Sequence, residues 1–318
     1  MTSLKSTAAH DSDSSYGHFR LTSASTLRWL PPLTVFVLLI GLNCRMSYSD
    51  EPPQNASTFE TPRAELLEFF VSEFVAITPG KGKFPAAFEM GSPDGPSTEL
   101  PVHRVTLKQP FSIARYEVTQ NLYAAVMGEN PSRWKGPRNS VEMFTRAEAV
   151  SFCEKATKHL REAGLIGDDE IIRLPTEAEW EYCCRAGTST SYSFGNQARK
   201  DGDKDAKATL LDEFGWHTGN AAGNDPPVGA LKPNAWGLYD FHGYLWEFVQ
   251  DDWSGDYSGA PNDGSARASD KSSESRHVVR GGSWRERFDR LTSTARMPVT
   301  SDFRRDDVGF RCVRARAN

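Results

Sequence analysis

The sequence predicts an α+β domain in which a few short helices and strands are joined by long ordered loops. Two Thr-x-x-Glu capping boxes, at 145–148 and 176–179, mark helix starts. Strand-like segments are short, and stretches dense in Gly, Pro, Asn, Asp and Ser separate them, notably 186–235 and 254–275. Loops of this length need support beyond sheet area, from disulfides, a bound cation or buried tryptophans.

The regular elements are expected where apolar residues recur with a helical or an extended period. Three helices are expected, because apolar residues follow at helical spacing after each capping box and in the segment from near Thr119 to Gly128. Four strands are expected from short apolar runs that separate turn-rich stretches. In chain order these runs are 74–77, 103–107, 277–280 and 309–313.

Composition limits the class of protein. Of the 318 residues, 38% are apolar and 25% charged, with 18 Phe and 8 Trp, so the chain is neither disordered nor collagen-like and can fill one large core. A formal charge of −5 and a pI near 5.9 argue against a nucleic-acid partner, which requires a basic face. Only one long apolar run is present, which excludes a protein with several membrane spans.

Residues 1–49 have the features of an export signal. They carry four basic and two acidic residues, a net charge of +2, and Arg28 stands just before an apolar segment at 30–42. This segment is short for a bilayer core of about 30 Å but suits the core of a signal peptide. Small residues at 47 and 49 fit a cut before Asp50. We expect a secreted, periplasmic or cell-envelope protein, with an uncleaved N-terminal membrane anchor as the alternative.

The chain after residue 49 divides into a linker and one domain. Residues 50–68 are polar and carry prolines, as linkers do, and the domain is expected at 69–318. Once Cys44 is removed with the leader, four cysteines remain, and in an oxidising compartment they allow three pairings. These are Cys153, Cys183, Cys184 and Cys312.

Common catalytic motifs are absent from the sequence. The chain lacks Gly-x-Ser-x-Gly, His-Glu-x-x-His and Gly-x-x-x-x-Gly-Lys. The seven histidines never fall at the spacing of metal ligands, so a histidine metal centre is not expected. The run Asp201-x-Asp203-x-Asp205 is similar to the start of an EF-hand loop, but Ala206 stands where that loop needs glycine, which favours a solvated turn.

Six segments, in order along the chain, carry a further pattern. They include Leu-Pro-Thr-Glu-Ala-Glu-Trp-Glu-Tyr and Arg-Gly-Gly-Ser-Trp, and their positions are 88–92, 115–123, 174–182, 234–248, 280–284 and 308–312. Together they resemble the formylglycine-generating enzyme (sulfatase-modifying factor) family over about residues 70–315. The resemblance implies the α+β, C-type-lectin-like fold of that family.

Two features of these segments also have a direct physical reason. Gly281 and Gly282 allow two backbones to approach more closely than side chains would permit. The tryptophans can bury large areas beneath the loops, and we expect them in the core. They are Trp180, Trp236, Trp246, Trp253 and Trp284.

Calcium is the cofactor that the resemblance implies. Carried over from the family, the ligands are the side chains of Asp240 and Glu247 and the backbone carbonyls of Gly243 and Leu245. Oxygen ligands on one tight turn suit this hard cation. The alternative for Glu247 is an ordinary role at a helix start or in a salt bridge.

Copper is not expected. Formylglycine generation in this family requires copper(I) held by two cysteines, three and eight residues after the serine of Arg-Gly-Gly-Ser. Counted from Ser283, these positions are Glu286 and Leu291, and neither side chain can hold cuprous ion. The stretch 284–309 contains no cysteine at all. We therefore predict that the chain does not make formylglycine by the copper route.

The resemblance also implies one disulfide, Cys153–Cys312. It would close a loop of about 160 residues and stabilise the fold by several kcal/mol at most. The family's second disulfide would join Cys184 to the position thirteen residues after Ser283, which is Arg296. Cys184 is therefore expected to be buried and inert.

The former substrate groove of the family is the expected binding site. Its predicted lining combines charged and aromatic side chains, as recognition surfaces often do: Ser283, Trp284, Arg285, Glu286, Arg287 and Arg296. We expect a module that binds a peptide, glycan or protein ligand. The alternatives are a formylglycine-generating oxidase with relocated ligands and another oxidative tailoring enzyme on the same fold.

Overall fold

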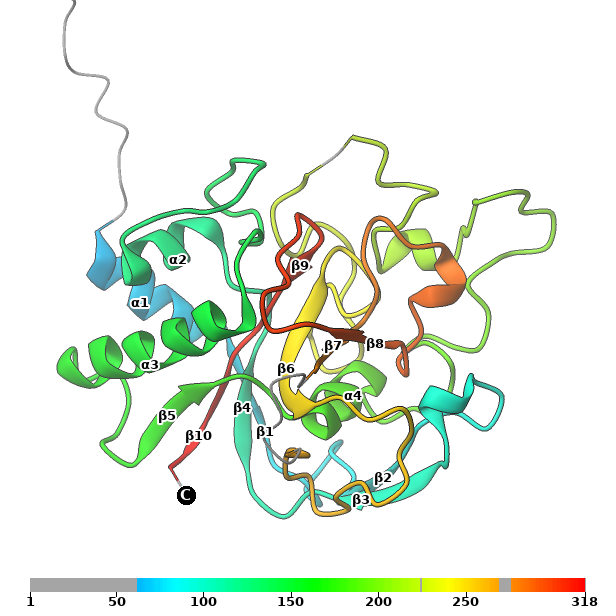
Figure 1. Cartoon of the computed structure of the whole chain (residues 1–318), viewed down its shortest axis with the longest axis horizontal. Coiled ribbons are helices and arrows are strands. Elements are labelled where there is room, and N and C mark those ends of the chain that lie inside the picture. Colours follow the sequence, from blue (N-terminus) through cyan, green and yellow to red (C-terminus); the bar gives the residue numbers. More distant parts are fainter. Residues whose placement is uncertain (1–61, 224, 269–275, 318) are drawn as a thin grey trace, which may run out of the picture. The chain divides into compact units, whose positions relative to one another are not determined.

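The structure is a computed structural model that describes residues 62–223, 225–268 and 276–317 (Figure 1). The predicted signal segment, its apolar stretch at 30–42, the cleavage site and the linker as far as residue 61 lie outside the described residues. The described residues belong to one compact unit. Within the described part of the chain, no helix is long and apolar enough to cross a membrane.

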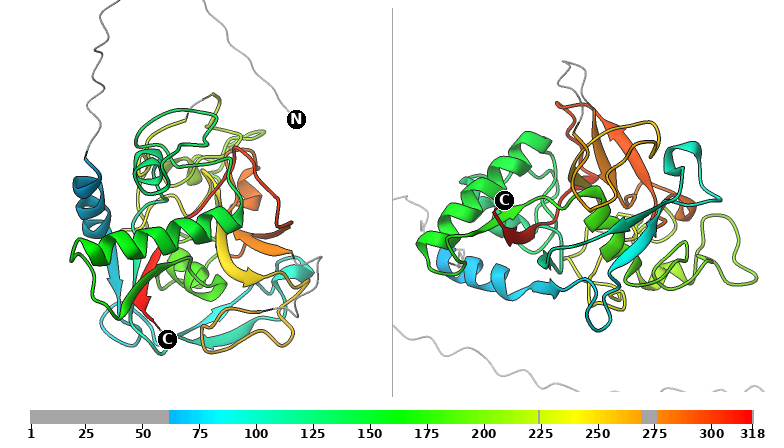
Figure 2. Two further views of the ribbon diagram at one scale, coloured as in Figure 1. Left: turned by 60° about the vertical axis from the view of Figure 1, so that its left-hand side comes forward. Right: turned by 90° about the horizontal axis from the view of Figure 1, so that it is seen from below.

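An antiparallel four-stranded sheet is covered by three helices that pack beside one another (Figure 1, Figure 2). The longest helix, α3, packs against β5. In spatial order the strands are β1 (Phe74–Ile77), β4 (Phe111–Ala114), β10 (Val313–Arg316) and β5 (Glu170–Arg173). The helices are α1 (Arg63–Ser72), α2 (Gln120–Met127) and α3 (Arg146–Glu162).

A second four-stranded sheet packs with helix α4 (Glu177–Arg185). Its order is β8 (Arg296–Val299), β7 (His277–Arg280), β6 (Trp246–Asp252) and β9 (Val308–Gly309), with β6 and β9 parallel. A separate pair, β2 (Ala87–Met90) and β3 (His103–Thr106), and three 3₁₀ turns complete the elements. The turns are Ser97–Glu99, Leu211–Glu213 and Phe288–Arg290. The predicted α+β class with few short elements is confirmed.

Both capping boxes start helices as predicted. The Thr145 hydroxyl accepts from the backbone N–H of Glu148, and the Glu148 carboxylate accepts from the Thr145 N–H; α4 repeats this arrangement at its own N-terminus. Helix α2 ends at Gly128, whose φ of 88° gives the left-handed cap that glycine adopts without strain.

Two boundaries differ from the prediction. The segment 309–313 is not one strand, because Gly309 pairs with β6 in the second sheet whereas Val313 begins β10 in the first. The chain therefore crosses between the sheets through three buried residues, 310–312. Helix α1 begins at Arg63, inside the predicted linker, since burial of its apolar side chains extends the domain toward the N-terminus.

The aromatic core lies on both sides of this crossing. Phe310 packs edge-on against Phe144 and Phe152, with ring centroids 5.1 and 5.3 Å away. Trp180, Trp236 and Trp246 are buried as predicted, whereas two other tryptophans, 253 and 284, are only partly buried. One of the latter faces the site described next.

Candidate ligand-binding site

The turn at Gly281 and Gly282 fixes the segment that carries Glu286 and Leu291. Both glycines have positive φ, 97° and 79°, and a Cβ on Gly282 would lie 2.8 Å from the carbonyl oxygen of Arg290. The close approach predicted here is confirmed. Leu291 is 0% exposed and belongs to a small apolar cluster, and the carbonyl of Glu286 accepts from the Thr218 N–H at 3.0 Å.

Cys184 and His242 lie beside Leu291, in an arrangement that does not suit a metal. The Cys184 Sγ is 3.9 Å from each ring nitrogen of His242, so it is directed at neither of them in particular. The nitrogens are engaged instead with the Leu291 carbonyl, at 2.9 Å, and the Ser193 N–H, at 3.0 Å. Burial lowers the pKa of His242 to about 4 and raises the pKa of Cys184 to about 12. Both groups are neutral at pH 7.

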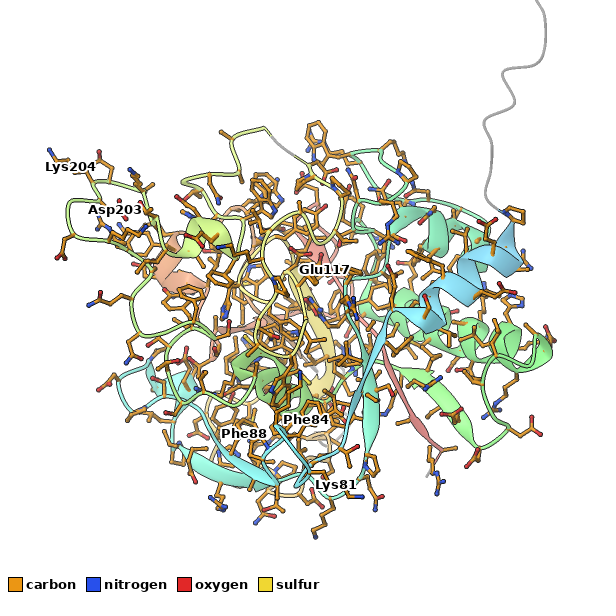
Figure 3. All side chains as sticks on the ribbon, turned by 180° about the vertical axis from the view of Figure 1, so that it is seen from behind. Lys81, Phe84, Phe88, Glu117, Asp203 and Lys204 are labelled. Carbon is orange, nitrogen blue, oxygen red and sulfur yellow. The ribbon has the colours of Figure 1, made fainter. Side chains whose placement is uncertain are left out.

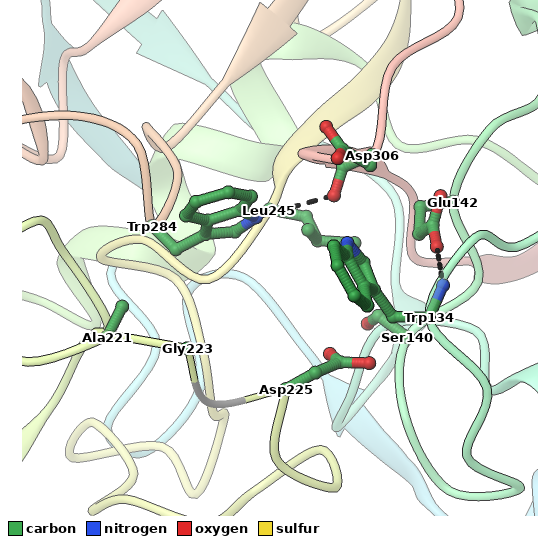
Figure 4. A pocket seen from close by; sticks show the side chains of 9 residues that line it. All are labelled: Trp134, Ser140, Glu142, Ala221, Gly223, Asp225, Leu245, Trp284 and Asp306. Carbon is green, nitrogen blue, oxygen red and sulfur yellow. Dashed lines mark hydrogen bonds between the residues drawn. The ribbon is translucent and has the colours of Figure 1, made fainter.

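A cavity of about 100 Å³ opens next to this segment (Figure 4). Two indoles stand on either side of it, Trp284 from the Arg-Gly-Gly-Ser-Trp turn and Trp134 from the loop after α2, with Leu245 between them. Acidic side chains complete much of the lining. The lining residues are Trp134, Ser140, Glu142, Ala221, Gly223, Asp225, Leu245, Trp284 and Asp306.

Asp306 holds two arginines at the rim of this cavity. Its Oδ1 accepts from Arg285 at 2.5 Å and its Oδ2 from Arg133 at 3.3 Å. Each arginine also lies over the indole that follows or precedes it, Arg133 at 4.9 Å from the Trp134 ring centroid and Arg285 at 4.6 Å from that of Trp284. One aspartate thus connects the two arginines that lie over the aromatic walls.

Glu142 is the buried acid of the cavity. It is 3% exposed, and its Oε1 accepts from the Trp134 N–H at 3.0 Å. Its Oε2 is buried without a hydrogen-bond partner. Burial raises the pKa of Glu142, and the nearby Asp306 and Asp225 carboxylates raise it further, against hydrogen bonds from backbone N–H groups.

The structure brings only part of the predicted groove to this cavity. Trp284 lines it and Arg285 stands at its rim, while Ser283 is buried beneath and bonds Asp307 at 3.0 Å. The exposed Arg287 pairs with Asp289, two residues along the same turn, and Glu286 is half-buried; neither belongs to the lining.

Arg296 does not belong to the groove, contrary to the prediction. It begins β8 and pairs with Glu177 of α4 through Nε and Nη2, at 2.7 and 2.9 Å. Its guanidinium also lies 4.4 Å from the ring centroids of Trp253 and Tyr257. Arg296 is therefore a structural residue between strand and helix, because the pairing of β8 with β7 turns it toward α4.

The predicted calcium ligands lie in a buried, charged centre. Glu247 accepts two hydrogen bonds from Arg311, at 2.6 and 2.7 Å, and one from the Trp180 indole at 2.9 Å. Burial raises the pKa of Asp240 to about 6, and its Oδ2 accepts from the Gly229 N–H at 2.7 Å.

Glu117, which no sequence motif indicated, is the third carboxylate of this centre and lies in the molecular interior (Figure 3). Burial, together with the charges of Glu247 and Asp240, raises its pKa well above the ordinary value. Its Oε2 accepts from the Ser140 hydroxyl, and its Oε1 is buried without a partner. Three carboxylates therefore face one guanidinium, a charge balance that suits an additional cation. Side-chain geometry alone does not form a metal shell, since no group of three or more His, Cys, Asp or Glu in the described ranges is arranged to hold a metal.

Cys153 and Cys312 are neighbours, as the predicted disulfide requires, but they are not bonded. Their Sγ atoms lie 3.9 Å apart between α3 and the crossing segment, and both thiols are buried. Cys184 is likewise buried, with 0% exposure. The pairing of Cys153 with Cys312 stays a prediction.

Comparison with known proteins identifies the family. The model of the sulfatase-modifying factor enzyme 1-like domain matches residues 67–316, and the chain belongs to this family. The predicted resemblance and fold are confirmed.

Curated relatives include both active and inactive members. Bovine inactive C-alpha-formylglycine-generating enzyme 2 is 32% identical over 282 residues, which cover 71% of this chain and 84% of the relative. The formylglycine-generating enzyme of Mycobacterium tuberculosis is 32% identical over 151 residues, 44% of this chain and 50% of the relative. Chaperone protein LppX of Paenibacillus barcinonensis is 29% identical over 181 residues, 45% and 64% respectively. The chain thus spans about half the length of the Mycobacterium enzyme.

Solved structures share the fold over most of their length. PvdO from Pseudomonas aeruginosa superposes with a TM-score of 0.62 and 30% identity, covering 73% of this chain and 92% of PvdO. Treponema denticola variable protein 1 also has a TM-score of 0.62, with 25% identity, covering 77% of this chain and 95% of that protein.

Proposed function

We propose that this member of the sulfatase-modifying factor family is an exported protein that binds a polypeptide ligand and does not generate formylglycine by the copper route. The observation that carries the proposal is that Glu286 and Leu291 stand where the family's copper-binding cysteines are expected. Leu291 is an apolar, fully buried side chain, and Trp284, seven residues before it, lines a cavity with aromatic and acidic walls.

Copper(I) does not fit the residues present. Cuprous ion requires soft thiolate ligands, and Glu286 supplies a hard carboxylate while Leu291 supplies no donor. The thiol of Cys184 lies 3.9 Å from each ring nitrogen of His242, and burial raises its pKa to about 12, so it is neutral at pH 7. The bovine relative named as an inactive formylglycine-generating enzyme supports the view that family members without this activity exist.

A binding role is supported by the exposed aromatic wall of the cavity. Trp134 is 47% exposed, and only Phe69 is similarly exposed among the large apolar side chains of the described residues. Exposed tryptophans flanked by arginines are typical of recognition sites. A polypeptide is favoured over a glycan because one relative, LppX, is named a chaperone protein.

Calcium is the proposed structural cofactor. Asp240 and the carbonyls of Gly243 and Leu245 would hold it, and Glu247 would share its charge between the ion and Arg311. The excess of carboxylates in this centre supports the proposal, because a divalent cation would neutralise charges that burial otherwise makes costly. Calcium would supply rigidity to the turn below the cavity.

Selection of random peptides displayed on phage against the full-length chain tests the binding role. We expect enriched peptides for the wild type and for Phe69→Ala, and their loss for Trp134→Ala, since the two aromatic side chains are equally exposed but only Trp134 lines the cavity. A glycan array is the parallel arm. Capture of glycans with no peptide enriched would contradict the choice of a polypeptide ligand.

Export is supported by the basic and apolar pattern of the leader. N-terminal sequencing of the mature protein from the culture medium or cell envelope would find Asp50 as its first residue. An intact N-terminus in the membrane fraction would instead support an anchor at 30–42.

A further inference from the structure

We propose that the cavity between Trp134 and Trp284 accepts an alkylammonium group, such as the side chain of a lysine in a bound peptide. The inference rests on the proposed function for the polypeptide character of the ligand. The choice of an alkylammonium group follows from the charges of the cavity lining, its two indole walls and its volume.

One acid of the cavity lacks a cationic partner among the described residues. Glu142 forms no ion pair within the described residues, and one of its oxygens is buried with no hydrogen bond. A buried acceptor left without a donor is unfavourable, so the site is incomplete as it stands. An N–H⁺ group from a ligand would satisfy this oxygen with a charge-assisted hydrogen bond.

The cavity lining carries a surplus of negative charge. Asp306 is neutralised at the rim by Arg133 and Arg285. Asp225, in contrast, accepts only from neutral groups, the amide of Asn139 at 2.7 Å and the hydroxyl of Tyr244 at 3.0 Å. With Glu142, this leaves two carboxylates at the cavity without a cationic partner in the described part of the chain.

The two indoles of the cavity favour a cationic ligand. The faces of tryptophan rings attract cations within about 6 Å of the ring centroid, more strongly when water is excluded. Both indoles already hold an arginine in this way, on the side of the rim. Their position on either side of the cavity (Figure 4) offers the same attraction to a ligand cation.

The hydrogen bonding of Glu142 favours an ammonium group over a guanidinium group. A guanidinium binds best to two oxygens of one carboxylate through its planar fork, whereas an ammonium is a compact point charge. Glu142 offers a single free oxygen, because its Oε1 is taken by the Trp134 N–H. The cavity of about 100 Å³ has room for a few non-hydrogen atoms, since one water needs roughly 10–15 Å³ of such space.

The test is a titration of the full-length protein with three small probes, followed by saturation-transfer NMR. The probes are n-butylammonium, n-butylguanidinium and n-butanol, which share the alkyl chain and differ in the head group. We expect n-butylammonium to bind at least tenfold more tightly than n-butanol. Glu142→Gln should abolish this difference, because the amide keeps the acceptor for the Trp134 N–H but presents no charge.

Glu129→Gln is the matched control, because it removes the same charge from an exposed position outside the cavity lining. It should bind the probes as the wild type does. Trp134→Leu, at an exposed position, gives an independent variant if Glu142→Gln does not fold, and it should weaken n-butylammonium binding severalfold. Circular dichroism verifies folding of each variant.

Equal binding of n-butanol, tighter binding of n-butylguanidinium, or an unchanged affinity in both cavity variants would overturn the inference. Phage-selected peptides that bind through Trp134 but lack lysine would overturn the inference and leave the proposed function standing. Binding of n-butylammonium without any selected peptide would support the cavity chemistry and contradict the proposed function.

Discussion

Leu291 lies against Gly243 so closely that a Cβ on the glycine would be 2.4 Å from the leucine Cδ2. The position at which the family places a copper-binding cysteine is thus filled by an apolar side chain that packs on the turn of the predicted calcium ligands. A substitution of Leu291 is therefore expected to disturb the turn at Gly243, and a substitution of Gly243 to disturb the packing of Leu291. This contact places the side chain that stands at a predicted copper position against the turn of the predicted calcium ligands.

Calcium should raise the thermal stability of the protein. At a free concentration a hundred times its Kd, calcium would stabilise the native state by about 2.7 kcal/mol, which corresponds to a rise of several degrees in Tm. Asp240→Asn should remove most of this rise. Asp203→Asn, in the exposed turn marked in Figure 3, should retain it. An unchanged Tm of the wild type at millimolar calcium would contradict the proposal.

Breaking the ion pair between Glu247 and Arg311 should strongly destabilise the fold. Both side chains are buried, so Glu247→Gln removes the one carboxylate that is hydrogen-bonded to the Arg311 guanidinium and should cost about 3–5 kcal/mol of unfolding free energy in calcium-free buffer. Glu89→Gln breaks the exposed pair with Arg104 and should cost less than about 1 kcal/mol. Urea unfolding measures both, and similar losses in the two variants would contradict the assignment.

Asp251 should make the fold less stable as pH rises from about 4 to 7. Burial, then the charge of Glu177, raises the pKa of Asp251 to about 7 from an ordinary 3.8. The native state therefore binds the proton on Asp251 more tightly than the unfolded state does. This proton binding contributes its full stabilisation below about pH 4, and the contribution is lost as the pH rises to about 7.

The corresponding measurement is urea unfolding of wild type and Asp251→Asn at pH 5, 6, 7 and 8. The free energy of unfolding of Asp251→Asn, relative to that of the wild type, should increase by up to about 1.4 kcal/mol for each pH unit up to pH 7. A difference between the two proteins that is constant across this range would count against the raised pKa.

Cys153 and Cys312 should form a disulfide in the exported protein. Their sulfurs are neighbours, and closing a loop of 159 residues would stabilise the fold by about 5 kcal/mol in the chain-entropy model. Peptide mapping without reduction should find the 153–312 cross-link, and Cys183 and Cys184 should be alkylated only after unfolding. Labelling of all four cysteines in the unfolded, unreduced protein would disprove the disulfide.

The sequence was sufficient to predict those parts of the fold that depend on local chemistry. The capping boxes at Thr145 and Thr176 place side-chain acceptors three residues before the amides they bind, so the helix starts can be read directly. The paired glycines at 281 and 282 likewise indicated a close approach. The absence of cysteine at positions 286 and 291 can be recognised by counting three and eight residues from Ser283.

The cavity could not be predicted in the same way. Trp134, Glu142 and Asp306 come from two loops that are more than 160 residues apart, and only their packing shows that they share a site. Arg296 was assigned to the groove by counting along the chain, but pairing within the sheet turned it toward α4. Glu117 gave no local signal, because its importance depends on two carboxylates brought near it by the fold.

Titration of the purified full-length protein with copper(I), in competition with a chromogenic chelator, tests the central claim most directly. The same samples are incubated with a sulfatase-motif peptide under oxygen and analysed by mass spectrometry. We predict that the chelator keeps the copper and that the peptide cysteine remains unmodified. Withdrawal of copper from the chelator together with conversion of the cysteine to formylglycine would contradict the account.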